Sequence, residues 1–596
     1  MNRCKRWVAL ALLVVFTLGS VVSEAAKPVP TIWSYLPDKP LIIVKLQEPQ
    51  RLTEQIIRYA QWPEIQGLAA FREFQASTPW KRFQQFVAYI EKELGTTWPE
   101  LLKQYSHEGV VFSLEAKIGQ PKADEAGAPP EAPRALLILP LKNAGQAQQV
   151  TQMIQELGQF ELARQDSKAK YQTTKHRDVS IVHLGDQFAF ASTGHYLILA
   201  NQPQVLKDAL DRKESMRKEP PAYLAAVEKK ANGTGQRIAW AWVDLMQIKQ
   251  DQNIHKLLEI PNNDPIPYYV LGGLLDAVRQ SSWALAELCS ANDDLMLQIT
   301  MPGGRKNMNP ALRAAFTPDP QGPGLQPYIE LPGTFYQQSF YFDINALLAH
   351  QADYLSESVR KEFQEFDKKS GFVLYGHRFS KIVSYLGGRH QFLVTQQRDT
   401  GYDVKPKTML PAFGLLLELR DPDAFDRAMQ PILRSVGLLG SLNVKMKMME
   451  EDVGNVHMIG YRMVDNEDNR SRDQGLLFNF SPCFARVGRF YMLASTQEMG
   501  RDLIQHLTHA PMQNVTNDGT SIRHHFSWPA LGLYFDSIKS AIVTQTILQE
   551  GGSRSEAEKQ FTLLKELLER LGTIELSVQY LEDQFRMELR TRVKQP

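Results

Sequence analysis

Cysteine is scarce in this chain, which has three cysteines in 596 residues. Cys4 stands at the very start, so only Cys289 and Cys483 belong to the main body. A small scaffold held together by disulfides is therefore excluded, since such scaffolds are short and rich in cysteine. We expect Cys289 and Cys483 to be two buried, inert thiols on strands, and a single bridge between them is the alternative.

An excess of charge of either sign is also missing. The chain has 67 Lys and Arg against 66 Asp and Glu, and its formal net charge is +1. A nucleic-acid partner normally requires a basic face, and nothing in the sequence points to one. After the first 26 residues no apolar run approaches the roughly 20 residues that cross a bilayer. We therefore expect no nucleic-acid partner and no transmembrane segment in the main body.

The sequence also lacks the common catalytic signatures. It contains no Gly-x-Ser-x-Gly, no His-Glu-x-x-His, no P-loop and no dinucleotide-binding fingerprint. This pattern favours a protein that is not an enzyme, and it predicts no cofactor.

The first 26 residues resemble a secretory signal peptide. Arg3, Lys5 and Arg6 form a basic start, an apolar run interrupted only by Thr17 follows, and Ser23-Glu24-Ala25 offers a small-x-small cleavage site. The alternative is an uncleaved anchor, but the apolar run is short for that role. We expect an exported protein, periplasmic or extracellular.

Several segments of the chain recur in the same order. RALLILPLKN at 134–143 is similar to AFGLLLELRD at 412–421, and FASTGHYLILA at 190–200 matches FARVGRFYMLA at 484–494. In the second pair Gly194 and Gly488 mark a tight turn between antiparallel strands. AWAWVD at 239–244 and LGLYFD at 531–536 are interpreted as a third pair of strands. Hairpins at 283–299 and 574–589 then close the two halves.

These repeats predict the domain organisation. The chain is too long for one core, since single cores stop growing at roughly 250 to 300 residues. We predict a signal peptide at 1–26, a first repeat at 27–301, a linker rich in proline and glycine at 302–327, and a second repeat at 328–596. The predicted fold is α+β: two tandem homologous halves, each a mainly antiparallel sheet with helices packed on one side.

Three aspartates follow aromatic strand ends at repeated positions. Asp244, Asp343 and Asp536 suggest an acid–base set, but a simpler role is to cap the helix that begins next. We predict helix caps. The aromatic residues beside them, Trp240, Trp242, Tyr341 and Phe342, are expected in the core, although a ligand groove is an alternative.

Two short motifs have the letters of catalytic sites. Asp399-Thr400-Gly401 resembles an aspartic-protease loop, but that chemistry needs a second such carboxylate, and the other half offers none. Ser215-Met216-Arg217-Lys218 matches Ser-x-x-Lys, but charged neighbours would keep the lysine solvated and protonated. We assign neither of them a catalytic role.

A histidine group is the best metal-binding candidate in the chain. His506 and His509 lie near the end of a predicted helix, and His524 and His525 follow later. No thiol is nearby, and adjacent histidines on a strand point to opposite faces, so we predict no metal site. Met446, Met448 and Met449 alternate with lysines, as in an amphipathic strand.

Taken together, the signal segment, the opening Leu-Pro strand at 36–46, the strand that ends in Leu-Lys-Asn or Leu-Arg-Asp, and the Phe-Ala-x-x-x-Gly-x-x-x-Leu-Ala hairpin resemble an exported bacterial family. It is known as the domain of unknown function 3352 family. The resemblance spans most of the chain beyond residue 26, and it transfers no catalytic residue.

We therefore expect a non-enzymatic binding or scaffold protein of the cell envelope that uses a groove between its two halves. The expected partner is a protein or an apolar ligand of the envelope. Two alternatives stay open. One is an envelope hydrolase whose residues converge only in space, and the other is a periplasmic carrier of lipids or apolar ligands.

Overall fold

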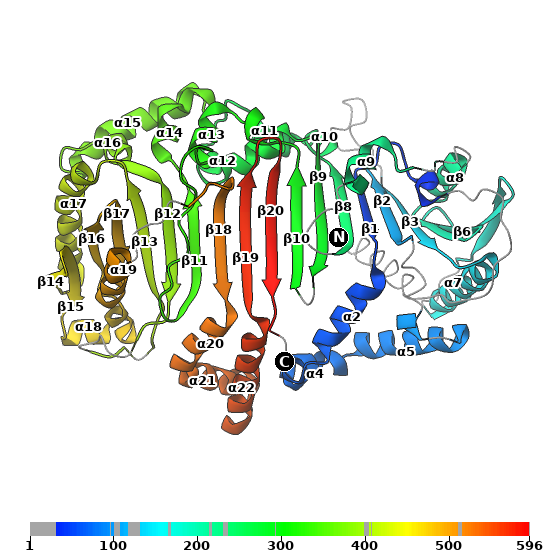
Figure 1. Ribbon diagram of the computed structural model, residues 1–596. Helices are drawn as coiled ribbons and strands as arrows, with labels where there is room; N and C mark the ends of the chain where they lie inside the picture. The colour runs from blue at the N-terminus through cyan, green and yellow to red at the C-terminus, as the bar shows by residue number, and fades with distance from the viewer. Residues whose placement is uncertain are drawn as a thin grey trace. The chain divides into compact units, whose positions relative to one another are not determined.

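The computed structural model describes residues 31–594 except 96, 101–107, 117–131, 165–168, 214–216, 218, 230–235, 292–293, 399–403, 407 and 510–514. The proposed signal peptide at 1–26 lies outside the described residues. The chain divides into two compact units, and Figure 1 labels their helices and strands. Unit 1 comprises residues up to Ile254 and Ser282–Ile299, and unit 2 comprises His255–Ser281 and Thr300–Pro596.

The sheet of unit 1 is antiparallel, with the strand order β10-β9-β8-β1-β2-β3-β7-β6-β5-β4. The last two residues of β10 fall in unit 2. The strands are β1 (Ile42–Leu46), β2 (Val110–Glu115), β3 (Arg134–Pro140), β4 (Gln172–His176), β5 (Val179–Leu184), β6 (Phe188–Thr193), β7 (Tyr196–Ala200), β8 (Gln236–Asp244), β9 (Trp283–Ala291) and β10 (Asp294–Met301).

The sheet of unit 2 has the same order of strands, β20-β19-β18-β11-β12-β13-β17-β16-β15-β14, and its ladders are also antiparallel. The strands are β11 (Thr334–Tyr341), β12 (Leu386–Thr395), β13 (Ala412–Leu419), β14 (Met446–Val453), β15 (Val456–Met463), β16 (Cys483–Val487), β17 (Phe490–Ala494), β18 (Thr520–Ser527), β19 (Thr573–Tyr580) and β20 (Phe585–Arg592). The predicted α+β class with antiparallel sheets is confirmed.

Turn glycines set the register of the matching hairpins in the two units. Gly194 joins β6 to β7 with φ +57°, and Gly488 joins β16 to β17 with φ +56°. Such angles are strained for residues with a Cβ atom. The registers Thr193↔Tyr196 and Val487↔Phe490 follow directly from these turns. The two hairpins predicted from sequence are therefore confirmed.

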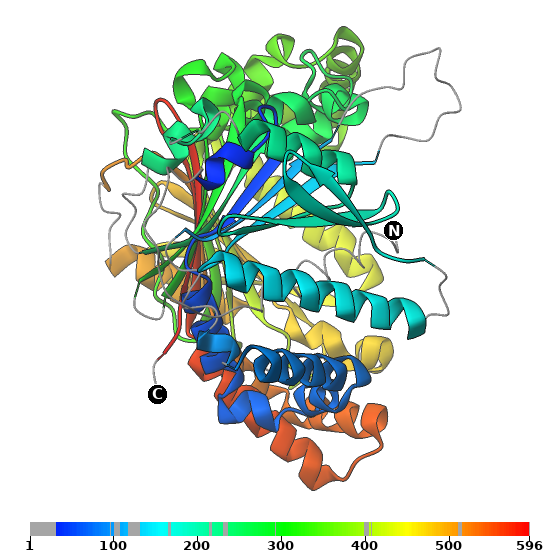
Figure 2. The same ribbon diagram turned by 90° about the vertical axis from the view of Figure 1, so that its right-hand side faces the viewer.

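The helices of unit 1 lie mainly before β2 and around the β3–β7 strands. They are η1 (Ile32–Tyr35), α2 (Pro49–Ala60), α3 (Pro63–Gly67), α4 (Ala69–Ala76), α5 (Thr78–Leu94), α7 (Ala144–Arg164), α8 (Pro203–Arg212), α9 (Ala222–Lys229), α10 (Leu245–Ile248) and α11 (Gln252–Leu258), which runs into unit 2. Figure 2 shows α7 as the long cyan helix running alongside the sheet.

Helices cover both faces of the strands β3 and β7 in unit 1. Ile138 on β3 and Ile198 on β7 pack in the cluster that contains Val205 and Leu206 of α8. Their sequence neighbours, including Leu197 and Leu199, pack in a second cluster with Val150 of α7. Successive strand residues point to opposite faces, so both faces are apolar here. The single helical layer expected from the sequence is thus joined by a second layer.

The helices of unit 2 follow the same plan, with α17 on one face of β13 and β17 and α19 on the other. They are α12 (Pro265–Gln280), η4 (Arg305–Asn307), α13 (Pro310–Phe316), α14 (Ile344–Ala349), η5 (Gln351–Asp353), α15 (Glu357–Val373), α16 (Phe379–Ser384), α17 (Pro422–Asn443), α18 (Glu467–Ser471), η6 (Arg472–Asn479), α19 (Gln497–His509), α20 (Trp528–Ser537), α21 (Lys539–Glu550) and α22 (Arg554–Leu571).

The segment predicted as a linker, 302–327, is packed structure. It contains η4 and α13, and Leu312 and Ala315 of α13 are fully buried. The linker prediction treats proline as a helix breaker. Pro310, however, occupies the first turn of α13, where a backbone N–H would have no partner within the helix, so its absence loses no hydrogen bond. Asn309 caps the helix by accepting hydrogen bonds from the N–H groups of Ala311 and Leu312.

The third predicted strand pair is wrong in its second member. Residues 531–536 lie within the helix α20, and the strand before it is β18. Ser527 caps α20 by accepting a hydrogen bond from the N–H of Ala530. The predicted role of Asp536 as the cap of the next helix is wrong, because the N-cap of α21 is Ile538, which makes no side-chain hydrogen bond. Asp536 lies in the last turn of α20 and pairs with Lys565 at 2.6 Å. A short apolar run cannot distinguish a strand from a buried helix.

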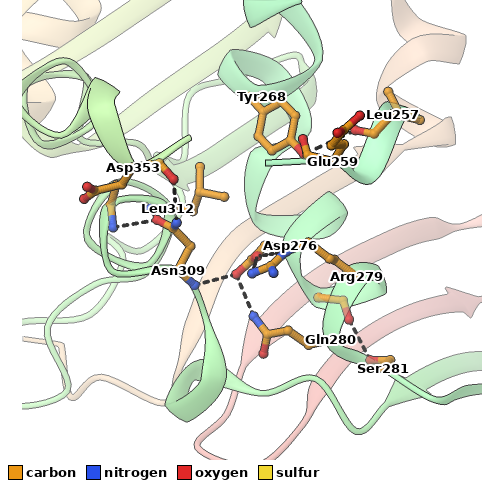
Figure 3. Close-up of polar contacts among 12 residues, drawn as sticks. Leu257, Glu259, Tyr268, Asp276, Arg279, Gln280, Ser281, Asn309, Leu312 and Asp353 are labelled. Carbon is orange, nitrogen blue, oxygen red and sulfur yellow. Dashed lines mark hydrogen bonds and ion pairs between the residues drawn. The ribbon is translucent and has the colours of Figure 1, made fainter. Parts of the chain in front are cut away.

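A buried carboxylate holds the segment 255–281 within unit 2. Asp276 of α12 is fully buried, and it accepts hydrogen bonds from the side chains of Arg279 and Gln280 and from the N–H of Asn309 at 2.7 Å (Figure 3). Ser281 adds a second link, since its Oγ accepts the N–H of Gly303 at 2.8 Å. These contacts join α12 to the start of α13.

Replacing Asp276 with alanine should destabilise unit 2 by about 2 to 3 kcal/mol, because it leaves the Asn309 N–H and the Arg279 guanidinium without their buried acceptor. Urea unfolding followed by hydrogen exchange in peptides of unit 2 measures this. Asp264→Ala, which removes the exposed cap of the same helix, is the matched control and should cost about 1 kcal/mol. Equal effects of the two substitutions would contradict this role of Asp276.

Candidate binding surface

Asp244 and Asp343 are helix caps, as predicted. Asp244 accepts hydrogen bonds from the N–H groups of Met246 and Gln247 at 2.8 and 3.1 Å. Asp343 accepts one from Ala346 at 3.0 Å and also binds the Arg420 guanidinium. The tryptophans beside Asp244 are in the core, since Trp240 is 1% and Trp242 4% exposed. These aspartates therefore have a structural role.

The four candidate histidines lie on two elements. His506 and His509 are in the last turn of α19, where His509 Nδ1 lies 2.7 Å from the carbonyl oxygen of Gln505. His524 and His525 are neighbours on β18, and His524 Nδ1 lies 2.8 Å from the Tyr336 hydroxyl. Burial lowers the pKa of His524. Within the described ranges no three His, Cys, Asp or Glu side chains form a group suited to a metal ion.

The two short catalytic-like motifs lie wholly or largely outside the described residues. Asp399-Thr400-Gly401 lies outside the described residues, and so do Ser215 and Lys218. The methionines at 446, 448 and 449 lie on strand β14, as predicted.

Cys289 on β9 and Cys483 on β16 are both buried, and neither forms a disulfide. Burial raises the pKa of the Cys483 thiol to about 12. The thiolate is the reactive form, so this side chain is chemically inert near neutral pH. The prediction of two buried thiols on strands is confirmed.

Neither Cys289 nor Cys483 should react with a water-soluble disulfide reagent in the native protein, because both thiols are shielded from solvent. Both should react once the protein is unfolded in urea. Thiol titration with Cys4 replaced by serine measures this. Rapid labelling of either cysteine under native conditions would contradict the buried state.

A buried ionic cluster joins β12 to β13 in unit 2. The Arg389 guanidinium binds the Glu418 carboxylate, whose side chain is 8% exposed. Burial acts to raise the pKa of Glu418, but the guanidinium outweighs it and holds that pKa below its usual range. His390 lies beside this pair, with Nε2 3.1 Å from the carbonyl oxygen of Phe342 and Nδ1 3.4 Å from the backbone N of Glu418.

These contacts select the neutral ring of His390. Nε2–H donates to the carbonyl of Phe342, and Nδ1 accepts the N–H of Glu418, so there is no place for a second proton. Burial lowers the pKa of His390 accordingly, although Glu418 and Asp343 act in the opposite direction. The cluster is a structural joint that weakens in acid.

The stabilising effect of His390 should decline as pH falls. In the unfolded chain histidine binds a proton below about pH 6.5, whereas the folded protein keeps His390 neutral to a lower pH. Folding stability is therefore lost as pH falls from the unfolded pKa towards the folded pKa. The difference in unfolding free energy between the wild type and His390→Gln should shrink between neutral pH and about pH 5.

A difference between the wild type and His390→Gln that stays constant with pH would contradict the neutral, buried state of His390.

A polar groove lies between α17 and the strands β15 and β16. It has a volume of about 310 Å³ and is lined by Asp426, Gln430, His457, Phe484 and Arg486 among others. Its polar groups already interact with one another and with neighbours. Gln430 binds Asp426 at 3.1 Å, His457 binds Asp452 at 2.8 Å, and Arg486 binds Asp423. The groove lies within unit 2.

A group of exposed apolar side chains of unit 2 lies at the junction of α15 and α16, two helices labelled in Figure 1. Phe372 is 96% exposed, Val373 71% and Tyr375 59%. Lys368, Lys369 and Arg378 are exposed beside them. We call these six residues the Phe372 corner. From Lys368 to Lys381 the sequence has four Lys or Arg and no Asp or Glu.

Buried polar contacts fix the chain beneath this corner. Asp367, buried on the inner side of α15, accepts the N–H of Ser380 at 2.7 Å and its hydroxyl at 2.8 Å. Ser370 Oγ accepts the N–H of Phe379 at 2.8 Å. The first turn of α16 is therefore tied to the last turns of α15. In the connection between them Leu374 packs against the core and Tyr375 is exposed.

An aromatic cluster between α15 and α16 lies beside the same corner. The ring of Phe379 lies 5.7 Å from that of Phe366 and 6.5 Å from that of Phe363. Tyr375 has φ +54°, and its hydroxyl binds Ser435 Oγ on α17. A left-handed conformation in a bulky residue needs support from its surroundings. The backbone of the Phe372 corner is therefore held in place by the residues around it.

The sequence analysis missed the Phe372 corner. It did not consider Phe372, Val373 and Tyr375. The signal that marks them is the overlap of apolar residues with a run of positive charge that contains no acid.

Comparison with known proteins gives little further guidance. No family model and no curated protein matches the chain. Three crystal forms of the protein TP0453 are similar over about half of it. Form I has 11% identity, a TM-score of 0.22, and coverage of 47% of this chain and 80% of that chain. Form III has 9% identity, a TM-score of 0.22, and coverage of 50% and 90%. Such values carry no argument about function.

No helix within the described part of the chain is long and apolar enough to cross a membrane.

Proposed function

We propose that this chain is an exported, non-enzymatic binding or scaffold protein of the cell envelope, and that it binds through the Phe372 corner. The proposal of export rests on the basic start, apolar run and small-residue site of residues 1–26. The proposal of binding rests on a positive observation, the surface at the junction of α15 and α16.

The observation that carries the proposal is the exposure of Phe372 and Val373 on a fixed part of the fold. Apolar side chains scattered singly on a surface are ordinary, whereas apolar residues gathered together mark interaction sites. Here they stand together in the last turn of α15, which hydrogen bonds of Asp367 and Ser370 tie to the first turn of α16. A surface that is already ordered loses little conformational entropy when it binds.

We further propose that the two units arose by internal duplication. In the described residues both sheets have ten strands in the same order. In unit 1 the central strand β3 pairs with β7, and in unit 2 β13 pairs with β17. In each case three other strands lie between the two partners in the sequence. The Phe372 corner lies in unit 2, in the segment before β12. The corresponding segment of unit 1, before β2, holds the helices α2 to α5. A new binding surface in one copy would leave the other copy free to serve as scaffold.

Replacing Phe372 and Val373 with serine should release the protein from the envelope fraction of a bacterial host that exports it, because two exposed apolar side chains of the Phe372 corner are lost. Retention on washed envelopes, measured by quantitative immunoblotting, tests this. Leu548→Ser is the matched control, since Leu548 on α21 is 76% exposed and also apolar.

The control should be retained like the wild type. Retention of the Phe372 and Val373 variant at the level of the wild type would contradict the proposed binding surface. Failure of the wild type to reach the envelope would contradict the proposed export.

A further inference from the structure

The charged side chains of the Phe372 corner indicate the class of partner that it binds. Lys368 and Lys369 lie four and three residues before Phe372, which places them on the same face of α15 as its ring. Arg378 follows the loop, and Lys381 is on α16. Glu365 pairs with Lys369 at 3.3 Å, so one acidic residue reaches this group. Among these charged side chains four are basic and one is acidic.

The carboxylate closest to the corner in sequence does not offset this charge at the surface. Asp367 is buried, and both of its oxygens accept hydrogen bonds from Ser380. It faces the inside of the junction and away from Phe372. The outer side of the corner thus combines exposed apolar groups with lysine and arginine.

This combination is more typical of a membrane surface than of a protein interface. The centres of protein interfaces are depleted in lysine, and their aromatic anchors enter pockets. At the surface of a bilayer, aromatic and aliphatic side chains enter the headgroup region while lysine and arginine contact anionic lipids. Tyr375 fits the same pattern because its ring is apolar and its hydroxyl is polar.

We infer that the Phe372 corner docks on the surface of an anionic lipid bilayer, with Phe372 and Val373 inserted among the lipids and Lys368, Lys369 and Arg378 against their headgroups. This inference rests on the proposed function, since it names the partner of the same surface. The protein does not cross the bilayer here. It lies on it through one corner of unit 2.

Flotation with lipid vesicles tests the inference. Protein purified from the exporting host is mixed with vesicles of phosphatidylcholine alone or of phosphatidylcholine with phosphatidylglycerol. All variants are compared in the same processing state of residues 1–26, as determined by mass spectrometry, because an uncleaved apolar segment would itself bind lipid. Binding to the anionic vesicles should exceed binding to the neutral ones and should fall as salt is added.

Two sets of variants separate the apolar and the ionic contributions. Phe372→Ser with Val373→Ser should weaken binding to anionic vesicles at least about tenfold. Lys368→Gln, Lys369→Gln and Arg378→Gln together should weaken it about a hundredfold and reduce the salt dependence. Leu548→Ser should bind as the wild type does. Because all the replaced side chains are exposed, circular dichroism should show unchanged folding.

The outcome also separates this inference from the proposed function. Absence of vesicle binding, or vesicle binding that both sets of variants leave unchanged, overturns the lipid inference. If envelope retention still depends on Phe372 and Val373 in that case, the binding function stands and the partner is a protein. If envelope retention is also insensitive to these residues, both proposals fail.

Discussion

Alternation of side chains along antiparallel strands is the constraint on which the rest of this structure depends. On β7, Ile198 faces one cluster while Leu197 and Leu199 face the other. On β17, Met492 and Tyr491 divide between two clusters in the same way. A strand that is apolar on both faces needs a cover on both. The helices α7 and α8 in unit 1, and α17 and α19 in unit 2, supply those covers.

At the ends of the strands in unit 2, two buried carboxylates act as joints between helices. Asp276 connects α12 with α13, and Asp367 connects α15 with α16. Burying a carboxylate is costly unless its oxygens are hydrogen-bonded, and in both cases backbone N–H groups and side chains satisfy them. The corner carrying Phe372 is a consequence of the second joint. Its exposed side chains are held in place by contacts that are themselves buried.

Where the sequence carries a strong local signal, it predicted the structure correctly. The hairpins around Gly194 and Gly488 follow from turn glycines between apolar strands, and the caps Asp244 and Asp343 follow from an aspartate at a strand end. The strand predicted at residues 531–536 is wrong, because a run of a few apolar residues fits a strand and a buried helix equally well. The linker predicted at 302–327 contains a helix, because Pro310 begins a helix and does not break one.

The Phe372 corner could not be found from periodicity. Helical spacing places Phe366 and Phe372 on α15, but their exposure depends on where α16 turns back. That turn depends on the contact between Asp367 and Ser380, which are separated by 13 positions in the sequence. Tertiary contacts of this kind leave no periodic trace. The local composition does carry a signal, because the segment from Lys368 to Lys381 contains basic residues and no acidic residue.

The most direct test of the account is the environment of residue 372 itself. In a chain carrying Cys4→Ser and Phe372→Cys, an environment-sensitive fluorophore can be attached at position 372, because Cys289 and Cys483 are buried. Addition of anionic vesicles should shift its emission to the blue, and lipids brominated along their chains should quench it. An emission spectrum unchanged by anionic vesicles, with no quenching, would contradict the insertion of this corner into a lipid surface.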